Sequence, residues 1–511
     1  MVGNRYPFID LFKGVVNTMV NTNKEVDKEL VESPKVYIEK VLQFGEGNFL
    51  RAFIDDFIDQ LNEKDLFNGS VVVVQPIPQG LADTINEQKG KYTVVLRGLV
   101  NGKLVVETRR VCSISRAINP YTEYDEYMRN MQNPNLRFIV SNTTEAGITY
   151  SETCKLTDKP PVSFPAKITA LLHERFNNFK GDPTKGFIFI PCELIDDSGT
   201  RLKEIVLRLA SEWQMGEDFI KWVRDCNYFT NTLVDRIVTG YPKDEIESME
   251  LGYEDKLVVA GEVYHFFAIE VPNDYALREL HEKLPFHKAG LNVLLTNDAT
   301  PYKLRKVRIL NGAHTMSVLA ARLSGIETVG EMVKDPLFAK YIRKGIFDEI
   351  IPTLDLLHED MIGFAESVFD RFGNPYIKHY LLSIALNSVA KYNARVLSTI
   401  LDYYNKFKLL PETLTLSFAA LIAFYSTEEA NDTELVMPWF KEKWTKVKSG
   451  ELTISELVNS VCTNADFWDG KDLTKELPGF AEKVTEHLQN INSKSTLAEG
   501  MRSELERVLN I

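Results

Sequence analysis

Residues 38–61, IEKVLQFGEGNFLRAFIDDFIDQL, contain the pattern that decides the fold of this chain. The first half is apolar and typical of a strand, Gly45 and Gly47 interrupt it, and phenylalanines then recur at every fourth position from Phe49. This spacing predicts an amphipathic helix. A glycine turn between a strand and a helix is where a βα unit holds the pyrophosphate of a dinucleotide. An ordinary glycine turn is the alternative.

Strand and helix patterns alternate after this stretch. The run Val71–Val74 is typical of a strand buried on both faces of a parallel sheet. Further strand patterns occupy 93–96, 104–108, 137–141 and 186–191, and helical patterns occupy 166–176 and 201–213. The alternation predicts a doubly wound α/β domain of the Rossmann type over residues 35–285, after a polar extension at 1–34.

Helical patterns dominate the rest of the chain. They lie at 302–323, 338–356, 377–404, 411–425 and 475–492. We therefore expect an all-α C-terminal domain over residues 286–511.

Composition limits the function classes. The chain has 511 residues, 44% of them apolar, and a net charge of −13, so nothing general attracts it to nucleic acid or an anionic membrane. Its five cysteines form no CxxC pair, which favours a reducing compartment and gives no metal framework. No signal peptide or membrane span is evident. A cytoplasmic enzyme with a small-molecule substrate is expected, with its oligomeric state open.

The residues expected to bind a cofactor lie on two loops and after the second strand. They are Phe44, Gly45, Glu46, Gly47, Asn48, Phe49, Arg51, Gln75, Asn142 and Thr143. Leu50 replaces the third glycine of the GxGxxG fingerprint. Gln75 stands where an acidic residue usually contacts the adenosine ribose, and no arginine directly follows it, which favours NAD over NADP. For the loop at Asn142, a capped helix start is the alternative.

A basic segment at 301–314 contains the candidates for the reaction. If it is an α-helix, Lys306, Asn311 and His314 lie within roughly 140° of one another and about 12 Å along the axis. Together they can transfer a proton and hold an oxygen without a metal. Burial and the charges of Arg305 and Arg308 are expected to lower the pKa of Lys306 toward roughly 7–8. A solvated basic face and a structural histidine are the alternatives.

Three motifs together resemble the long-chain mannitol dehydrogenase family of polyol and uronate oxidoreductases. They are GEGNFLRAF at 45–53, NTLVDRI at 231–237, and Lys306-x4-Asn311-x2-His314. The resemblance runs from about residue 36 to the C-terminus. It implies a Rossmann-type domain, a helical domain, an active site between them, and zinc-independent hydride transfer with NAD. It also implies that Lys306 is the general acid/base, that Asn311 and His314 polarise the reacting oxygen, and that Lys391 is functional.

Two departures from the polyol-acting members favour the uronate branch. Leu194 replaces an asparagine of the oxyanion hole, and Ser383 replaces an arginine eight positions before Lys391. Four stretches, SNTTEAGITY, IPCELID, LVDRIVTGYP and NPYIKHYLLSIALNS, resemble the uronate-acting members most closely. That resemblance implies interconversion of D-tagaturonate and D-altronate in hexuronate catabolism. A fructuronate reductase, a polyol 2-dehydrogenase and a non-catalytic dinucleotide sensor are alternatives. The substrate carboxylate needs a cation, for which the candidates are Lys391, Lys378, Arg371 and Arg395.

Overall fold

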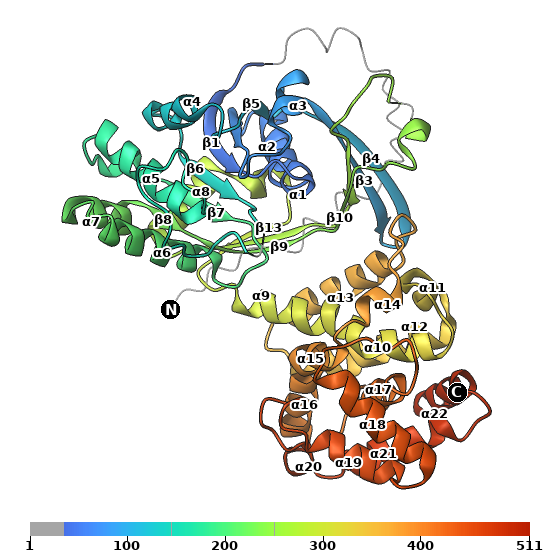
Figure 1. The fold of residues 1–511 in the computed structure, drawn as a ribbon. Helices are drawn as coiled ribbons and strands as arrows, with labels where there is room; N and C mark the ends of the chain where they lie inside the picture. Colours follow the sequence, from blue (N-terminus) through green and yellow to red (C-terminus); the bar gives the residue numbers. More distant parts are fainter. Residues whose placement is uncertain (1–34, 145, 250) are drawn as a thin grey trace, which may run out of the picture. The chain divides into compact units, whose positions relative to one another are not determined.

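The computed structural model describes residues 35–144, 146–249 and 251–511, which form two compact units (Figure 1). The first comprises the described residues up to Leu96 together with Val106–Ala299, and the second comprises Arg97–Val105 and Thr300–Ile511. The predicted extension 1–34 lies outside the described residues. The first unit continues beyond residue 285, because β13 (Val293–Thr296) pairs in parallel with β12 (Phe266–Glu270).

A six-stranded parallel sheet forms the centre of the first unit, in the order β5-β2-β1-β6-β7-β8. Its strands are β1 (Ile38–Phe44), β2 (Gly69–Val74), β5 (Ile114–Ile118), β6 (Phe138–Ser141), β7 (Ile188–Pro191) and β8 (Tyr228–Phe229). The strand order reverses between β1 and β6. The carboxyl ends of strands at such a reversal are where open α/β sheets bind ligands.

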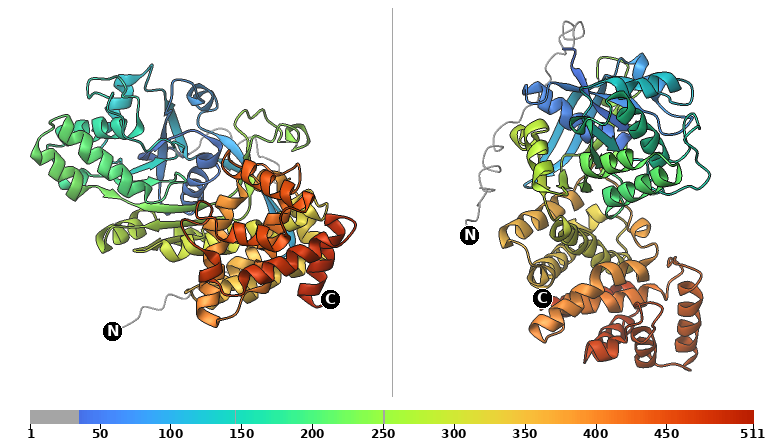
Figure 2. Two further views of the ribbon diagram at one scale, coloured as in Figure 1. Left: turned by 60° about the horizontal axis from the view of Figure 1, so that its bottom comes forward. Right: turned by 90° about the vertical axis from the view of Figure 1, so that its left-hand side faces the viewer.

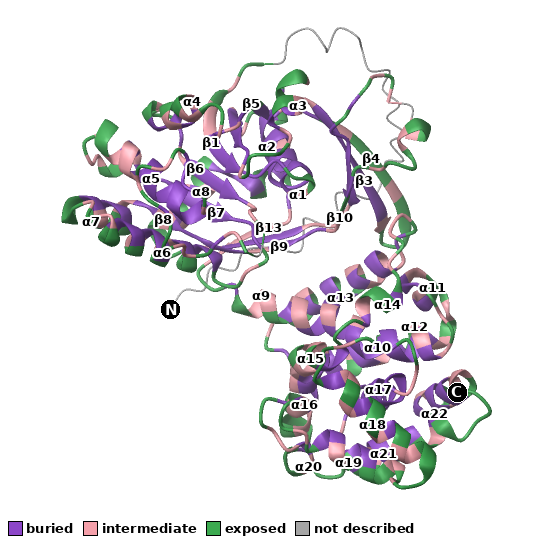
Figure 3. Ribbon diagram, in the orientation of Figure 1, coloured by how far each residue is buried: buried purple, intermediate pink, exposed green. Residues whose placement is uncertain are grey.

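Helices cover both faces of this sheet, and most residues of its strands are buried (Figure 3). The helices of the unit are α1 (Asn48–Arg51), α2 (Ile54–Glu63), α3 (Ala82–Glu87), α4 (Tyr124–Arg129), α5 (Phe164–Asn178), α6 (Ser198–Glu212), α7 (Glu217–Cys226) and α8 (Asp274–Lys283), with short 3₁₀ turns η2 (Asn130–Gln132), η3 (Pro183–Lys185), η4 (Ile246–Met249) and η5 (Phe286–Ala289). Val71 and Val73 pack in one core with α2, whereas Val72 and Val74 pack in another with α5, α6 and α7. The α/β fold class is thereby confirmed.

Two predicted strands do not join the parallel sheet. Residues 93–96 and 104–108 belong to β3 (Tyr92–Val100) and β4 (Lys103–Val111), which lie in a second sheet of order β10-β11-β3-β4. A third sheet has the order β13-β12-β9; the remaining strands are β9 (Asn231–Asp235), β10 (Val238–Gly240) and β11 (Val259–Glu262).

Helices make up the second unit from Thr300 onward, as predicted (Figure 2). They are α9 (Thr300–Arg305), η6 (Lys306–Asn311), α10 (Gly312–Leu323), α11 (Val329–Lys334), α12 (Pro336–Lys344), η7 (Gly345–Ile350), η8 (Ile351–Thr353), α13 (His358–Phe372), α14 (Leu381–Ile384), α15 (Ser388–Tyr392), η9 (Asn393–Leu397), α16 (Ser398–Phe407), α17 (Glu412–Phe424), α18 (Val436–Ser449), α19 (Ile454–Cys462), α20 (Leu473–Glu476), α21 (Phe480–Asn492) and α22 (Leu497–Leu509). The turns η6, η7 and η9 are π-helical.

Several predicted helices are interrupted. The pattern at 377–404 breaks at Asn387, whose φ is 54°, and that at 475–492 breaks at Gly479, whose φ is 84°. A left-handed residue cannot continue a right-handed helix, so each pattern forms separate helices. The 3₁₀ turn η8 ends the predicted 338–356 helix early.

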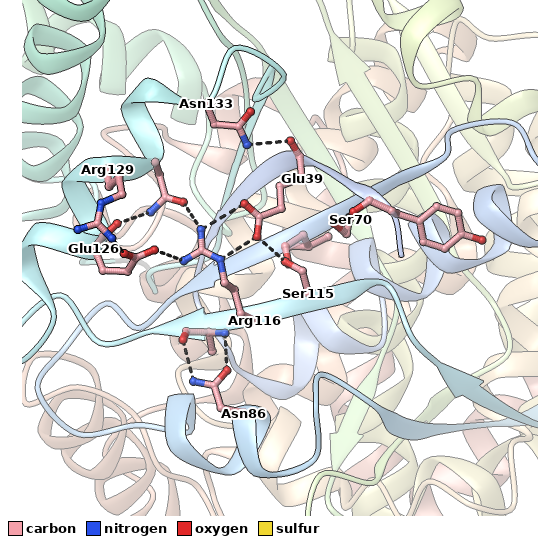
Figure 4. Close-up of polar contacts among 12 residues, drawn as sticks. Glu39, Ser70, Asn86, Ser115, Arg116, Glu126, Arg129 and Asn133 are labelled. Atoms are coloured by element: carbon pink, nitrogen blue, oxygen red, sulfur yellow. Dashed lines mark hydrogen bonds and ion pairs between the residues drawn. The ribbon is translucent and has the colours of Figure 1, made fainter. Parts of the chain in front are cut away.

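An ion-pair network ties β5 to the amino end of β1 (Figure 4). Arg116 donates from Nε to Glu39 Oε1 at 2.7 Å, from Nη2 to Glu39 Oε2 at 3.2 Å, and from Nη1 to Glu126 Oε1 at 3.0 Å. Its Nη2 also donates to Asn130 Oδ1 at 2.8 Å. This forked contact holds the amino end of β1, and the glycine turn follows the carboxyl end of the same strand.

Replacing Arg116 with methionine is expected to lower the free energy of unfolding by about 1–2 kcal/mol, because a partly buried, forked ion pair is lost. The midpoint of urea unfolding measures this. Arg129→Met is the matched control: Arg129 also contacts Glu126, but its side chain is 63% exposed, so a change within about 0.5 kcal/mol is expected. Equal losses of unfolding free energy in the two variants would contradict a stabilising role for the forked Arg116 contact.

Candidate active site

The turn after β1 needs glycine for two reasons. Gly45 has a φ of 121°, and a Cβ on it would lie 3.0 Å from the carbonyl oxygen of Asn142. At Gly47, by contrast, a Cβ would meet no protein atom within 4 Å. The backbone of the turn is therefore held tightly at Gly45 and is open at Gly47, which is the arrangement a phosphate-binding turn requires.

The helix predicted after this turn is present but interrupted. Helix α1 ends at Arg51, α2 starts at Ile54, and Phe53 between them has φ −132° and ψ −87°. The hydroxyl of Tyr92 donates to the Arg51 carbonyl at 2.8 Å. This is the acceptor that a continuous helix would use for the N–H four residues on.

Arg51 is buried and shapes the turn from within. Its Nε donates to the Glu46 carbonyl at 3.1 Å, its Nη2 to Asn48 Oδ1 at 2.8 Å, and its Nη1 to the Leu257 carbonyl. Phe44 is also buried, against Tyr127. These two predicted cofactor residues therefore support the turn.

Two polar side chains meet beside Gly80, in the loop after β2. A Cβ on Gly80 would lie 2.2 Å from Glu46 Oε1 and 2.6 Å from Gln75 Oε1. The Gln75 amide bonds within its own loop, donating to the carbonyls of Ile77 and Pro78. Glu46 is 8% exposed, and its Oε2 is buried without a hydrogen-bond partner. Burial raises the pKa of this carboxyl.

A buried glutamate fixes the second predicted loop. Thr143 donates to Glu193 Oε1 from its backbone N at 3.0 Å and from its Oγ1 at 2.9 Å, and Ser141 Oγ donates to Glu193 Oε2 at 3.1 Å. Asn142 Nδ2 donates to the Cys192 carbonyl at 2.7 Å. Sequence reasoning missed this role of Glu193, since the pattern shows a carboxylate but not what it contacts. Leu194 beside it is 68% exposed, and its side chain offers no donor.

A π-helical turn changes the geometry of the second candidate site. Lys306–Asn311 form the turn η6 between α9 and α10. A π-turn bonds residue i to i+5, so the side chains of Lys306 and Asn311 start from one face, whereas an α-helix would set them about 140° apart. The turn thus aligns the two residues more closely than predicted.

His314 follows on the first turn of α10. Its ring stacks on Phe372 at 4.1 Å between centroids and meets His379 edge-on at 5.5 Å. Its Nε2 is shielded from solvent and has no hydrogen-bond partner. Burial, with the charges of His379, Arg371 and Arg395, holds the pKa of His314 well below its usual value. The imidazole is therefore neutral, and it can donate one hydrogen bond without carrying a charge.

The cations considered for the substrate carboxylate lie in different surroundings, and the charges of Arg371 and Arg395 act on His314. Arg395 Nη1 lies 3.4 Å from Thr315 Oγ1, and Lys391 Nζ donates to the Ile384 carbonyl at 2.8 Å. Burial and the Arg395 charge lower the pKa of Lys391. Arg371 is 8% exposed at the end of α13. Lys378 instead lies at the surface over the ring of Tyr380.

The basic residues beside Lys306 have other contacts. Arg308 donates to Thr399 Oγ1 at 2.7 Å and pairs with Asp402 at 2.9 Å. Arg305 lies over the rings of Tyr302 and Phe364. The Arg308 charge is thus paired with the Asp402 carboxylate.

The described residues show neither a metal-binding cluster nor a membrane-spanning helix. No cluster of three or more His, Cys, Asp or Glu side chains suited to a metal ion occurs among them. No described helix combines the length and apolarity needed to cross a membrane.

Comparison with known proteins identifies the family. The mannitol dehydrogenase Rossmann domain matches residues 39–280, and the mannitol dehydrogenase C-terminal domain matches residues 298–492. The chain therefore belongs to the mannitol dehydrogenase family of oxidoreductases.

The chain is similar to curated relatives along most of its length and to solved structures in its fold. The altronate oxidoreductase of Pectobacterium atrosepticum is 44% identical over 482 residues, covering 92% of this chain and 96% of its own. That of Yersinia enterocolitica is 46% identical over 462 residues, covering 89% and 94%. The solved structure of Pseudomonas fluorescens mannitol 2-dehydrogenase with NAD and D-mannitol superposes with a TM-score of 0.60 at 18% identity, covering 93% and 95%. The solved structure of a D-sorbitol dehydrogenase superposes with a TM-score of 0.73 at 19% identity, covering 92% of this chain and 95% of its own. The last two show the fold alone.

Proposed function

We propose that the chain is a cytoplasmic NAD-dependent oxidoreductase that interconverts D-tagaturonate and D-altronate in hexuronate catabolism. The observation that carries the proposal is the placement of Lys306 and Asn311 on one π-helical turn, followed by a neutral His314. The names of the relatives that match over nine-tenths of the chain support the choice of substrate.

The first unit fits a dinucleotide. The open backbone at Gly47 and the tight turn at Gly45 suit a pyrophosphate, and the unpartnered Oε2 of Glu46 suits a hydroxyl donor. Asn48 and Phe49 follow at the start of α1. Asn142 and Thr143 border the turn through the Asn142 carbonyl beside Gly45. When bound, NADH supplies the hydride that reduces the substrate ketone.

The second unit provides the acid/base chemistry. Lys306 gives a proton to the ketone oxygen during reduction and takes it back during oxidation. Asn311 donates from its amide, and neutral His314 donates from its imidazole, to the oxygen as negative charge develops on it. Because Leu194 has no donor, these two side chains form the oxyanion hole in this proposal.

Parallel assays of NADH oxidation with tagaturonate, fructuronate and fructose test the function. We expect the highest kcat/KM with tagaturonate. A preference for fructuronate or for fructose would assign the chain to one of the other branches of the family. NADH binding without turnover of any of the three would indicate a non-catalytic dinucleotide sensor.

Lys391 is our first choice as the cation for the substrate carboxylate. We expect Lys391→Met to lower kcat/KM for tagaturonate by about ten- to a hundredfold, because a charge-assisted hydrogen bond is lost. Turnover of fructose, which has no carboxylate, should suffer less.

Lys406→Met is the matched control. Lys406 also donates from Nζ to a backbone carbonyl, that of Pro352 at 2.7 Å, so its loss reports on anchoring alone. If Lys391→Met impaired both substrates equally, the lysine would serve packing or the reacting oxygen, and Arg371 or Lys378 would become the candidate.

A further inference from the structure

The residue that directly follows β2 is not acidic. In many dinucleotide-binding folds an aspartate or glutamate after the second strand accepts hydrogen bonds from the ribose hydroxyls. Here that position is Gln75, which is 3% exposed. Its Nε2 donates to Ile77 O at 2.9 Å and Pro78 O at 3.0 Å, and its Oε1 accepts from Ala82 N at 3.1 Å. Both ends of the amide thus hold the loop.

Glu46 brings a carboxylate to the same place from the glycine turn after β1. The Cβ position of Gly80 lies 2.2 Å from Glu46 Oε1 and 2.6 Å from the Gln75 amide, so the carboxylate lies against the loop that follows β2. Only a residue without a side chain at position 80 leaves room for it.

The carboxylate is buried but incompletely satisfied. Burial raises the pKa of this carboxyl, and the backbone N–H groups of Glu46 and Leu81 and the charge of Arg51 only partly oppose that rise. Oε2 has no hydrogen-bond partner and no solvent exposure. A buried carboxylate oxygen without a donor is costly, and native structures rarely keep one unless a ligand or water supplies the donor.

We propose that Glu46 accepts hydrogen bonds from the adenosine ribose hydroxyls and thereby selects NAD(H) over NADP(H). This inference rests on the proposed dinucleotide function and adds the residue that discriminates between the two cofactors. A 2′-phosphate would remove a hydroxyl donor and place its negative charge against the Glu46 carboxylate, which disfavours NADP(H) by repulsion.

Titration calorimetry on the full chain with ADP-ribose and with 2′-phospho-ADP-ribose tests the proposal without turnover. We expect the unsubstituted protein to bind ADP-ribose more tightly. Glu46→Gln should weaken ADP-ribose binding by about ten- to a hundredfold, without weakening 2′-phospho-ADP-ribose. The kcat/KM ratio for NADH over NADPH should fall by a similar factor.

Glu39→Gln is the matched control, because Glu39 lies at the other end of the same strand and contacts Arg116. It should change neither the relative affinity for ADP-ribose and 2′-phospho-ADP-ribose nor the kcat/KM ratio for NADH over NADPH. Gly80→Ala is a second variant on an exposed loop, and its Cβ would displace the Glu46 carboxylate. It should also weaken ADP-ribose binding, even if Glu46→Gln fails to fold.

The proposal is overturned if Glu46→Gln, or Gly80→Ala where the former does not fold, keeps the preference of the unsubstituted protein. That result, with normal NADH binding, would leave the proposed function intact. Failure of the unsubstituted protein to bind either probe or NADH would refute the proposed function itself, and with it this inference.

Discussion

Lys306→Ala is expected to lower kcat by about 10²–10⁴-fold while leaving NADH affinity unchanged. General acid–base catalysis typically contributes a factor of this size, and the substitution removes the only group to which we assign proton transfer. Lys306 lies on the π-helical turn of the second unit, whereas the proposed dinucleotide residues lie in the first. Steady-state kinetics with tagaturonate, together with NADH fluorescence titration, measure both quantities.

Two further variants separate proton transfer from charge. Lys306→Arg keeps a positive charge, but a guanidinium does not release its proton near neutral pH, so this variant should be about as slow as Lys306→Ala. Lys303→Ala, on the preceding helix α9, controls for the loss of a basic residue and should retain most activity. Near-normal kcat in Lys306→Ala would refute the assignment, and recovery in Lys306→Arg would reduce the role of the lysine to electrostatics.

Local patterns sufficed for the central fold. The run Val71–Val74 indicated a strand with two buried faces, and its alternate residues do pack in separate cores. The breaks in helices were not predictable in the same way. At the interruption after Arg51, the Arg51 carbonyl accepts from the Tyr92 hydroxyl, which is distant in sequence. Hydrophobic spacing carries no signal for such a contact.

In the candidate site, too, local features could be predicted from the sequence and features that involve distant residues could not. The need for glycine at position 45 follows from the local turn, and its φ of 121° agrees. The π-helical register at Lys306–Asn311 is not visible in the hydrophobic spacing, which is the same for an α-helix interrupted by one such turn. Likewise, the sequence shows a glutamine after β2 but not that its amide is bonded within its own loop.

His314→Phe is expected to lower kcat by about 10²–10³-fold, the usual cost of removing one oxyanion-hole donor. Phenylalanine keeps the stacking on Phe372 but has no N–H. Because the pKa of His314 lies well below its usual value, the imidazole is already neutral, and the loss should be the same at about pH 6 and pH 8. Steady-state kinetics at the two pH values measure it.

The pH dependence of the melting temperature separates the proposed catalytic role of His314 from a role in packing. The folded-state pKa of His314 is depressed, so the unfolded chain binds the extra proton, and stability present above the unfolded pKa of about 6.5 is lost as the pH falls. His314→Phe should therefore flatten the decline of the melting temperature between about pH 7 and pH 5. His379→Phe removes the neighbouring imidazole but no assigned donor, and should reduce kcat far less. Normal kcat in His314→Phe, together with a flatter pH profile, would show that the histidine is structural and that Asn311 alone holds the reacting oxygen.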